Sequence, residues 1–293
     1  MVTPSQFDAN RAPAPVSTMP GHVEDHDVSA NTRNLADFTG AAAPISEQGL
    51  DQATQLLGTG AAEIWTVLAV ETNGFGYLAD RRPAILFERH IFHQQTGGRF
   101  DAGDPSVCSN KPGGYLGGAR EYGRMAQAIA LDRRAALNSA SWGIGQIMGS
   151  SFAAAGFTSV EEAVDAMMQS EDNQLTSMAR FVRSAGLHGA LANHDWTGFA
   201  RGYNGPDFAR NQYPARLAGF FQKFTAGPLP DVRVRQTQAL LTFLNIDPGA
   251  IDGVAGKRTR SAIVQYRAPN GLGNSDEIDD SLIAALYASV AAL

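Results

Sequence analysis

The stretch AAEIWTVLAVETNGFG, residues 61–76, carries the pattern that decides the fold. Apolar residues recur in it at the spacing of one helix face, and an acidic residue falls in phase with them. The residues in phase are Ile64, Val67, Leu68 and Glu71. The letters NGFG that follow are typical of a helix end. Glu71 is therefore predicted to lie on the apolar stripe in the last turn, where burial and the helix dipole both raise the pKa of its carboxyl group.

Sequence on either side predicts more helix and little sheet. Ser46 is a plausible N-cap for a helix reaching residue 57. Residues 83–92 alternate in character and predict a short strand or extended segment in which Glu88 and His90 share a face. The letters SWGIGQIM, residues 141–148, predict a strand-like piece broken by glycine. Further helices are predicted at 119–137, 160–184 (one or two), 196–200, through 216–224, and at 232–244, 259–266 and 279–288.

Length and composition limit the possible classes. The chain has 293 residues, 44% of them hydrophobic, and a net charge of −6, which suggests about two domains and argues against a nucleic-acid binder. Its longest apolar run, residues 61–70, is too short to span a bilayer. The N-terminus carries no secretory signal pattern. Cys108 is alone, so no internal disulfide forms, which fits synthesis in a reducing compartment.

The chain is predicted to divide into three parts. Residues 1–45 are polar and Pro/Ala-rich and predict an extended or disordered leader. Residues 46–226 form the larger folded domain, and the letters GPLP at 227–230 predict a hinge. Residues 227–293 form a small helical module.

Glycoside cleavage requires a carboxylic acid that stays protonated near neutral pH, and the apolar helix end places Glu71 in such surroundings. The alternative is a glutamate that extends to water from a helix end. Three segments resemble, in order, the hallmarks of goose-type lysozymes and soluble lytic transglycosylases. They are ETNG at 71–74, SWGIGQI at 141–147 and YNGP at 203–206. The letters RPAILFERHIF, residues 82–92, resemble the N-acetylmuramidase domain of phage endolysins.

This resemblance implies a mainly α, lysozyme-like catalytic domain with a small β-hairpin or sheet. By the same resemblance Glu71 is the general acid, Gln146 and Tyr203 line the sugar cleft, and Asn204 helps to shape it. Trp142 belongs to the core or, like Tyr203, stacks on a sugar face.

The second carboxylate stays open. Glu88 is the first choice, as a group that holds a water or stabilises positive charge, and its alternative is a structural partner of Arg89 or His90. The other candidates are Asp80, Asp101 and Asp104. Without such a base, the substrate's own acetamido or 6-hydroxyl group reacts, and the enzyme is a lytic transglycosylase.

The C-terminal module resembles the three-helix peptidoglycan-binding domain of wall hydrolases, through the turn IDG at 251–253 with Gly256 and Thr259 after it. We expect no cofactor and no metal, since His90, His93 and Glu88 form no known zinc motif.

The expected function is that of an endolysin cleaving the β-1,4 bond between N-acetylmuramic acid and N-acetylglucosamine. Its partner is the peptidoglycan glycan strand, with no nucleic acid, no stable membrane association and a monomeric state. It is made in the host bacterial cytoplasm and reaches the wall after release through a holin-like partner. The alternatives are the transglycosylase and a non-catalytic peptidoglycan-binding protein.

Overall fold

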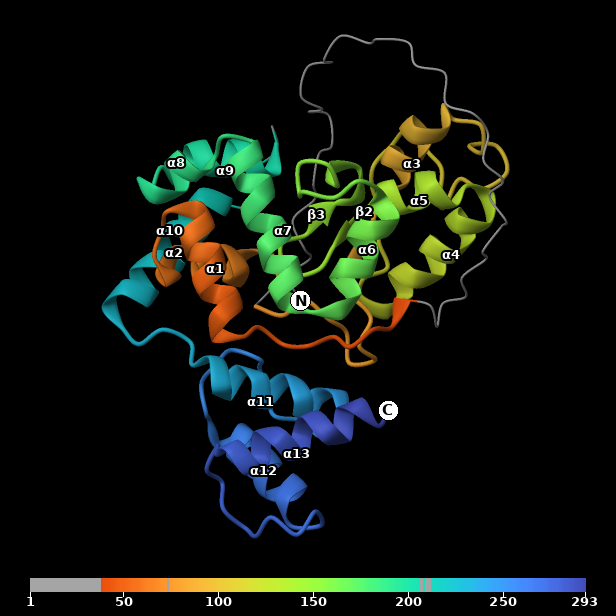
Figure 1. The fold of residues 1–293 in the computed structure, drawn as a ribbon. Helices are drawn as coiled ribbons and strands as arrows, with labels where there is room; N and C mark the ends of the chain where they lie inside the picture. The colour runs from red at the N-terminus through yellow and green to blue at the C-terminus, as the bar shows by residue number, and fades with distance from the viewer. Residues whose placement is uncertain (1–37, 73, 206–207, 209–211) are drawn as a thin grey trace.

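The computed structural model describes residues 38–72, 74–205, 208 and 212–293. This part of the chain is mainly helical, with one antiparallel sheet of three short strands in the order β1-β2-β3 (Figure 1). Most of the expected leader, residues 1–37, lies outside the described residues, as do Asn73 and Pro206 of the quoted motifs. The expected fold class, mainly helix with a small sheet, is confirmed.

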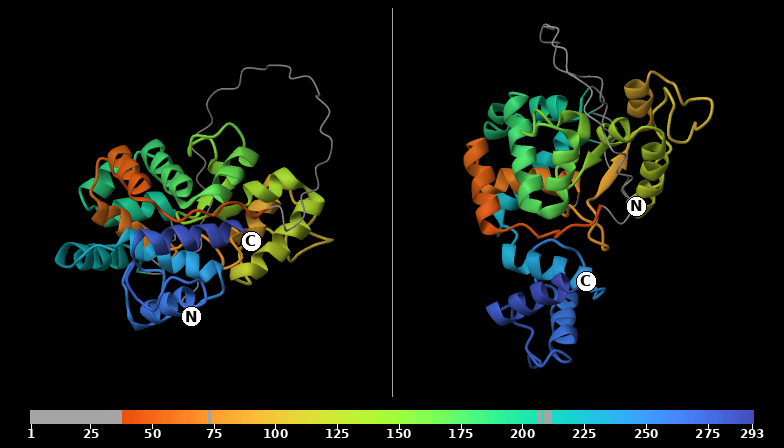
Figure 2. Two further views of the ribbon diagram at one scale, coloured as in Figure 1. Left: turned by 60° about the horizontal axis from the view of Figure 1, so that its bottom comes forward. Right: turned by 45° about the vertical axis from the view of Figure 1, so that its right-hand side comes forward.

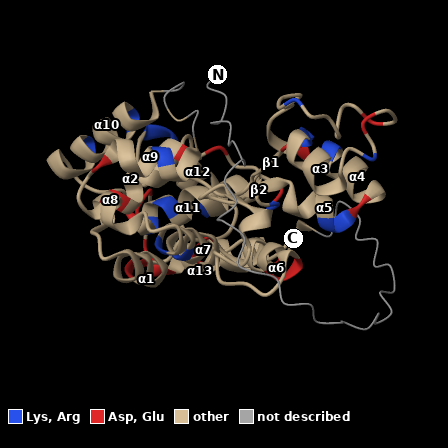
Figure 3. Cartoon of the chain, turned by 90° about the horizontal axis from the view of Figure 1, so that it is seen from above, with Lys and Arg blue, Asp and Glu red and all other residues tan. Residues whose placement is uncertain are grey.

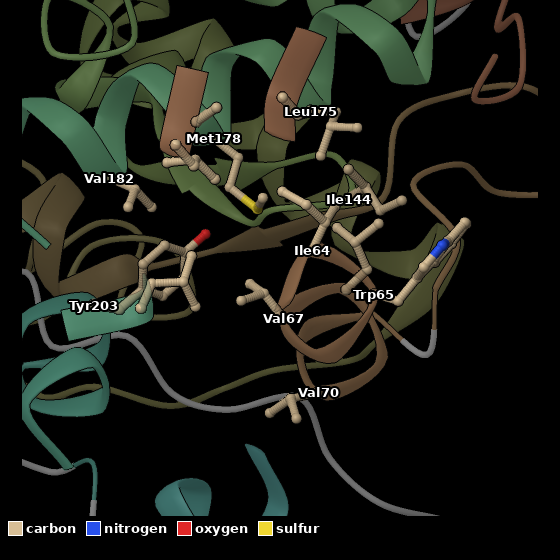
Figure 4. Close-up of a cluster of buried hydrophobic side chains, with 14 of the residues drawn as sticks. Ile64, Trp65, Val67, Val70, Ile144, Leu175, Met178, Val182 and Tyr203 are labelled. Carbon is tan, nitrogen blue, oxygen red and sulfur yellow. The ribbon is translucent and has the colours of Figure 1, made fainter. Parts of the chain in front are cut away.

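The first lobe is a helical bundle around α2, whose residues Ile64, Val67 and Leu68 are fully buried. Figure 4 shows Val67 of α2 facing a cluster that contains Met178 and Tyr203. Burial of each such side chain stabilises the fold by about 1.5–3 kcal/mol, so the apolar face of α2 holds the helix in place. The helices are α1 (Glu47–Leu57), α2 (Ala61–Glu71), α7 (Glu171–Ser184), α8 (His188–Ala192), α9 (Trp196–Asn204) and α10 (Tyr213–Ala226).

The second lobe packs helices against the sheet. Its core contains Phe87 of β1 and Trp142 of β2, with Ile85 opposite Trp142 and Ser141 opposite Met148 in the strand register. The strands are β1 (Ile85–Phe87), β2 (Ala140–Trp142) and β3 (Ile147–Met148). The helices are α3 (Arg89–Thr96), α4 (Glu121–Leu131), α5 (Arg133–Asn138) and α6 (Val160–Gln169), with short 3-10 turns at Gly118–Arg120 and Gly149–Ser151.

The alternating stretch 83–92 is only partly strand. β1 ends at Phe87, and α3 begins at Arg89 with Glu88 as its N-cap. The prediction that Glu88 and His90 share a strand face is therefore wrong, because Glu88 caps the helix on which His90 lies. The expected helix 119–137 is likewise two helices, separated at Asp132, whose carboxylate caps the second one.

Residues 38–45, expected to belong to the leader, run in extended form across the two lobes. Phe38 is buried in the second lobe, with its ring centroid 5.5 Å from that of Tyr122. Ala43 forms a parallel bridge with Ser170, and Ile45 is buried in the core of the first lobe. These residues join the cores of both lobes.

The C-terminal helices lie together beneath the two lobes in Figure 1, and both views of Figure 2 keep them on one side. They are α11 (Val232–Phe243), α12 (Lys257–Arg267) and α13 (Asp280–Ala291). Their core continues into the first part of the chain, since Phe243 packs on Phe75 at a centroid distance of 5.8 Å. The buried pair Arg235–Glu171, with N and O atoms 2.5 Å apart, also crosses this boundary.

The turn after α11 depends on glycine. Gly253 has φ +72°, and a Cβ there would lie 2.8 Å from the backbone nitrogen of Asp231. The Asp252 carboxylate accepts hydrogen bonds from Val254 N and the Gln238 side chain. These residues thus shape the fold of the module.

No helix in the described ranges has the length and apolar character needed to cross a bilayer. Acidic and basic residues are interspersed along the helices (Figure 3).

Candidate active site

Glu71 is the last residue of α2, and its side chain is buried, with 5% exposed. The helix ends there because the N–H groups of Thr72 and Gly74 both donate to the carbonyl of Leu68. The Thr72 hydroxyl donates to Ile144 O at 3.2 Å, which ties this end to the turn between β2 and β3. The predicted position of Glu71 at a buried helix end is confirmed.

Helix α10 supplies the partners of this carboxyl group. The Tyr213 hydroxyl donates a hydrogen bond to Glu71 Oε1, and Arg216 contributes positive charge nearby. The other oxygen, Oε2, has no hydrogen-bond partner among the described residues. Burial raises the pKa of Glu71 to about 7 despite the opposing effects of Tyr213 and Arg216. The raised pKa lets Glu71 hold a proton near neutral pH, which is the state a general acid requires.

Tyr203 and Asn204, at the end of α9, lie next to this group. Tyr203 is buried, its hydroxyl donates to Gly145 O at 2.7 Å, and the Glu71 carboxylate is near enough to raise its pKa further. The Asn204 side chain is also buried near the Tyr213 hydroxyl, but neither its amide nitrogen nor its amide oxygen has a hydrogen-bond partner among the described residues. The structure therefore brings three predicted residues together at the junction of α2, α9 and α10.

Gln146 supports this junction from the protein interior. It adopts φ +48°, and its side chain forms hydrogen bonds within the turn and with neighbouring backbone. Its amide nitrogen donates to Gly143 O (2.8 Å) and Ala84 O (3.2 Å), and its amide oxygen accepts from the Ser141 hydroxyl (2.8 Å). The side chain was expected to line the sugar cleft, but these contacts point inward. Gln146 holds the turn whose carbonyls bind Thr72 and Tyr203.

Trp142 belongs to the core. Only 2% of it is exposed, and its indole N–H donates to Leu137 O at 3.2 Å. The alternative in which its ring stacks on a sugar is not supported, because no face of the ring reaches solvent.

Glu88 lies in the second lobe and is fully buried. Its Oε2 accepts from the Tyr115 hydroxyl at 2.7 Å and lies 3.2 Å from His90 Nδ1, while its Oε1 has no hydrogen-bond partner among the described residues. Of the other candidates, Asp80 pairs with Arg82 at 2.6 Å and Asp101 with His93 at 2.8 Å, while Asp104 is half-buried.

Tyr213 and Arg216 were not predicted. They lie one turn apart on α10, so both side chains reach α2, and Arg216 also donates to Val70 O at 3.0 Å. The sequence predicts a helix through Arg216, and the three-residue spacing places Tyr213 and Arg216 on one face of it. The sequence does not show that this face packs against α2.

A buried acid at a helix end, set beside two tyrosines and against the turn between β2 and β3, is the arrangement of a lysozyme-like glycosidase. Comparison with known families agrees: residues 60–225, more than half of the chain, match the N-acetylmuramidase family, and the protein belongs to it. It is therefore a glycosidase-type enzyme that acts on peptidoglycan.

A solved structure gives a more particular likeness. The crystal structure of an endolysin from Burkholderia phage AP3 is 37% identical, with a TM-score of 0.59, over 63% of this chain and 73% of that one. This match confirms the lysozyme-like fold expected from the sequence. A comparison with curated proteins found no match.

Proposed function

We propose that the protein is an endolysin that hydrolyses the β-1,4 bond between N-acetylmuramic acid and N-acetylglucosamine, with Glu71 as the general acid. The main support for this proposal is the buried carboxyl group at the end of α2, whose pKa is raised to about 7. This group donates its proton to the glycosidic oxygen as positive charge develops on the anomeric carbon.

The neighbours of Glu71 stabilise it after the proton has left. The Tyr213 hydroxyl donates to the carboxylate and the Arg216 charge attracts it, so both favour the ionised form that proton transfer produces. Tyr203 and Asn204 are positioning residues in this proposal. The Tyr203 hydroxyl fixes the turn between β2 and β3 through Gly145 O, and the buried Asn204 side chain fills the space beside it at the end of α9.

Glu88 remains our choice for the second carboxylate. One of its oxygens is held by Tyr115, and the other has no hydrogen-bond partner among the described residues, so this buried group has capacity to accept from a water. Asp80 and Asp101 are weaker candidates because both oxygens of each carboxylate already accept hydrogen bonds, those of Asp80 from Arg82 and those of Asp101 from His93 and Cys108.

The two folded parts of the chain have different roles in this proposal. Residues 46–226 carry the catalytic site, and residues 227–293 bind peptidoglycan and keep a polymeric substrate close, which adds avidity without adding chemistry. The enzyme works as a monomer, is made in the cytoplasm of the host bacterium and reaches the wall after release by a holin-like partner.

Mass spectrometry of soluble fragments from purified sacculi tests the proposal. Wild-type protein is expected to release muropeptides with ordinary reducing N-acetylmuramic acid ends. Glu71→Gln should release these fragments at least about 10²-fold more slowly, while Glu47→Gln, at an exposed position in α1, should match wild type. Ends of 1,6-anhydro-N-acetylmuramic acid would show that the enzyme is a lytic transglycosylase and not a hydrolase. Fragments cut at peptide bonds, or binding to sacculi without any fragments, would overturn the proposal.

A further inference from the structure

The segment 97–117 follows α3 and contains no helix or strand. Three potential metal ligands meet where it folds back on α3: His93 in the last turn of α3, and Asp101 and Cys108 in the segment itself. His93 Nδ1 lies 2.8 Å from Asp101 Oδ2, and Cys108 Sγ lies 3.0 Å from Asp101 Oδ1. One nitrogen, one oxygen and one sulfur thus lie within 4.8 Å of one another.

These separations fit a shared ion. Zinc binds nitrogen and oxygen at about 2.0 Å and sulfur at about 2.3 Å in tetrahedral geometry, which sets neighbouring ligand atoms roughly 3.3–3.6 Å apart. The three ligand atoms here all lie within 4.8 Å of one another, with the two closest pairs near 3 Å. Small side-chain rotations therefore convert the hydrogen-bonded cluster into a coordination shell.

The cluster is also open on one side. The side chains of His93 and Asp101 are 29% and 40% exposed, whereas Cys108 is buried beneath them. Gly98 keeps the space beside the imidazole free, since a Cβ there would lie 2.8 Å from His93 Cε1. An ion can enter from solvent, meet nitrogen and oxygen first, and reach the sulfur below.

We propose that His93, Asp101 and Cys108 form a zinc site. Zn²⁺ accepts the lone pair of His93 Nδ1 and an oxygen of the Asp101 carboxylate. The Cys108 thiol releases its proton to solvent and binds as thiolate, and one water completes four-coordination. The two anionic ligands balance the charge of the ion. A thiolate with an imidazole selects zinc over magnesium or calcium, which prefer all-oxygen ligands.

The site has a structural consequence for the second lobe. The same segment reaches Glu88 through the Tyr115 hydroxyl, and Arg89 holds it through the carbonyls of Lys111 and Pro112. Zinc fastens the other end of the segment to α3. The ion therefore stiffens the wall around Glu88 and takes no part in proton transfer.

Cobalt provides a specific probe because Cys108 is the protein's one cysteine. Titration of the metal-free full-length protein with Co²⁺ should give one equivalent of binding, a thiolate-to-cobalt charge-transfer band and the visible bands of a four-coordinate ion. Added Zn²⁺ should displace the cobalt and bleach these bands. Zn²⁺ should also raise the melting temperature of the wild-type protein.

Matched variants locate the ligands. Cys108→Ser keeps a hydroxyl donor toward Asp101, so it should fold, yet it should lose the charge-transfer band. His93→Gln and Asp101→Asn should each weaken binding at least about tenfold. His194→Gln, whose imidazole pairs with Glu63, should bind as wild type does, and so should the double variant His22→Gln/His26→Gln in the N-terminal segment.

Two results would overturn the zinc site. One is the absence of a thiolate band at saturating Co²⁺ in protein whose fold is verified by circular dichroism. The other is a band that persists unchanged in both His93→Gln and Asp101→Asn. Neither result bears on Glu71, because the readout is spectroscopic and does not depend on lysis.

Discussion

Two buried glutamates lie at opposite ends of their helices. Glu171 is the first residue of α7, and its two oxygens accept from Ile45 N (3.0 Å), Gly76 N (2.8 Å) and the Arg235 guanidinium. Glu71 is the last residue of α2 and receives a single hydrogen bond, from Tyr213, while its Oε2 has no hydrogen-bond partner among the described residues.

A structural carboxylate and a reactive one differ here in how many donors their oxygens have. Both oxygens of Glu171 are satisfied by several donors, whereas burial with a single hydrogen bond raises the pKa of Glu71. The two are also connected, because Arg235 donates to Gly74 O and Glu171 accepts from Gly76 N. The structural carboxylate thus holds the loop that directly follows the reactive one.

The largest expected effect is on the rate. Glu71→Gln removes the proposed proton donor and should lower the rate of sacculus solubilisation about 10²–10⁴-fold with the fold intact. Turbidity loss together with circular dichroism measures both quantities. A folded variant with near wild-type lysis would show that Glu71 is not the proton donor.

Removing the ion-pair partner of Glu171 should lower the stability of the protein instead of its rate. Arg235→Met leaves Glu171 buried without its counter-charge, which should lower the free energy of unfolding by about 3–5 kcal/mol. Adding Glu171→Gln should recover part of that loss, since no buried charge remains. Urea denaturation of both variants provides the measurement. A loss below about 1 kcal/mol in Arg235→Met would contradict the structural role.

The raised pKa predicts a stability change with pH. The pKa of Glu71 goes from 4.5 to about 7 on folding, so between those values the folded protein binds more protons than the unfolded chain. Stability from this group is therefore present below pH 4.5 and lost as pH rises to 7, by about 3 kcal/mol in all. Wild type should lose this amount relative to Glu71→Gln over that window. Urea denaturation at several pH values gives the free energy of unfolding of both proteins. If the two values change with pH by the same amount, Glu71 has no such pKa shift.

The smallest effect concerns the alkaline limb of activity. Tyr213→Phe removes a hydrogen bond that lowers the pKa of Glu71, so the pH at which activity declines should move upward and the maximal rate should fall. Arg216→Met should shift the limb in the same direction by less, as the weaker of the two effects. The pH dependence of kcat tests both variants, and a downward shift would refute the assigned contacts.

Local pattern was sufficient for much of this protein. The buried end of α2, the Ser46 cap and the helices of the C-terminal module were all predicted, because periodicity and capping act over a few residues. The Pro83–Phe92 segment misled the prediction because a short strand and a capped helix follow each other there, and Glu88 belongs to the cap.

The mainly helical class, the family and the position of Glu71 on an apolar helix face follow from sequence patterns. Which groups surround that carboxyl group depends on packing, because Tyr213 lies 142 positions away in the chain. The tertiary structure likewise placed Trp142 in the core, paired Arg235 with Glu171 and gathered His93, Asp101 and Cys108. A residue's helix depends on its near neighbours, whereas its pKa and its ligands depend on side chains that packing brings from elsewhere.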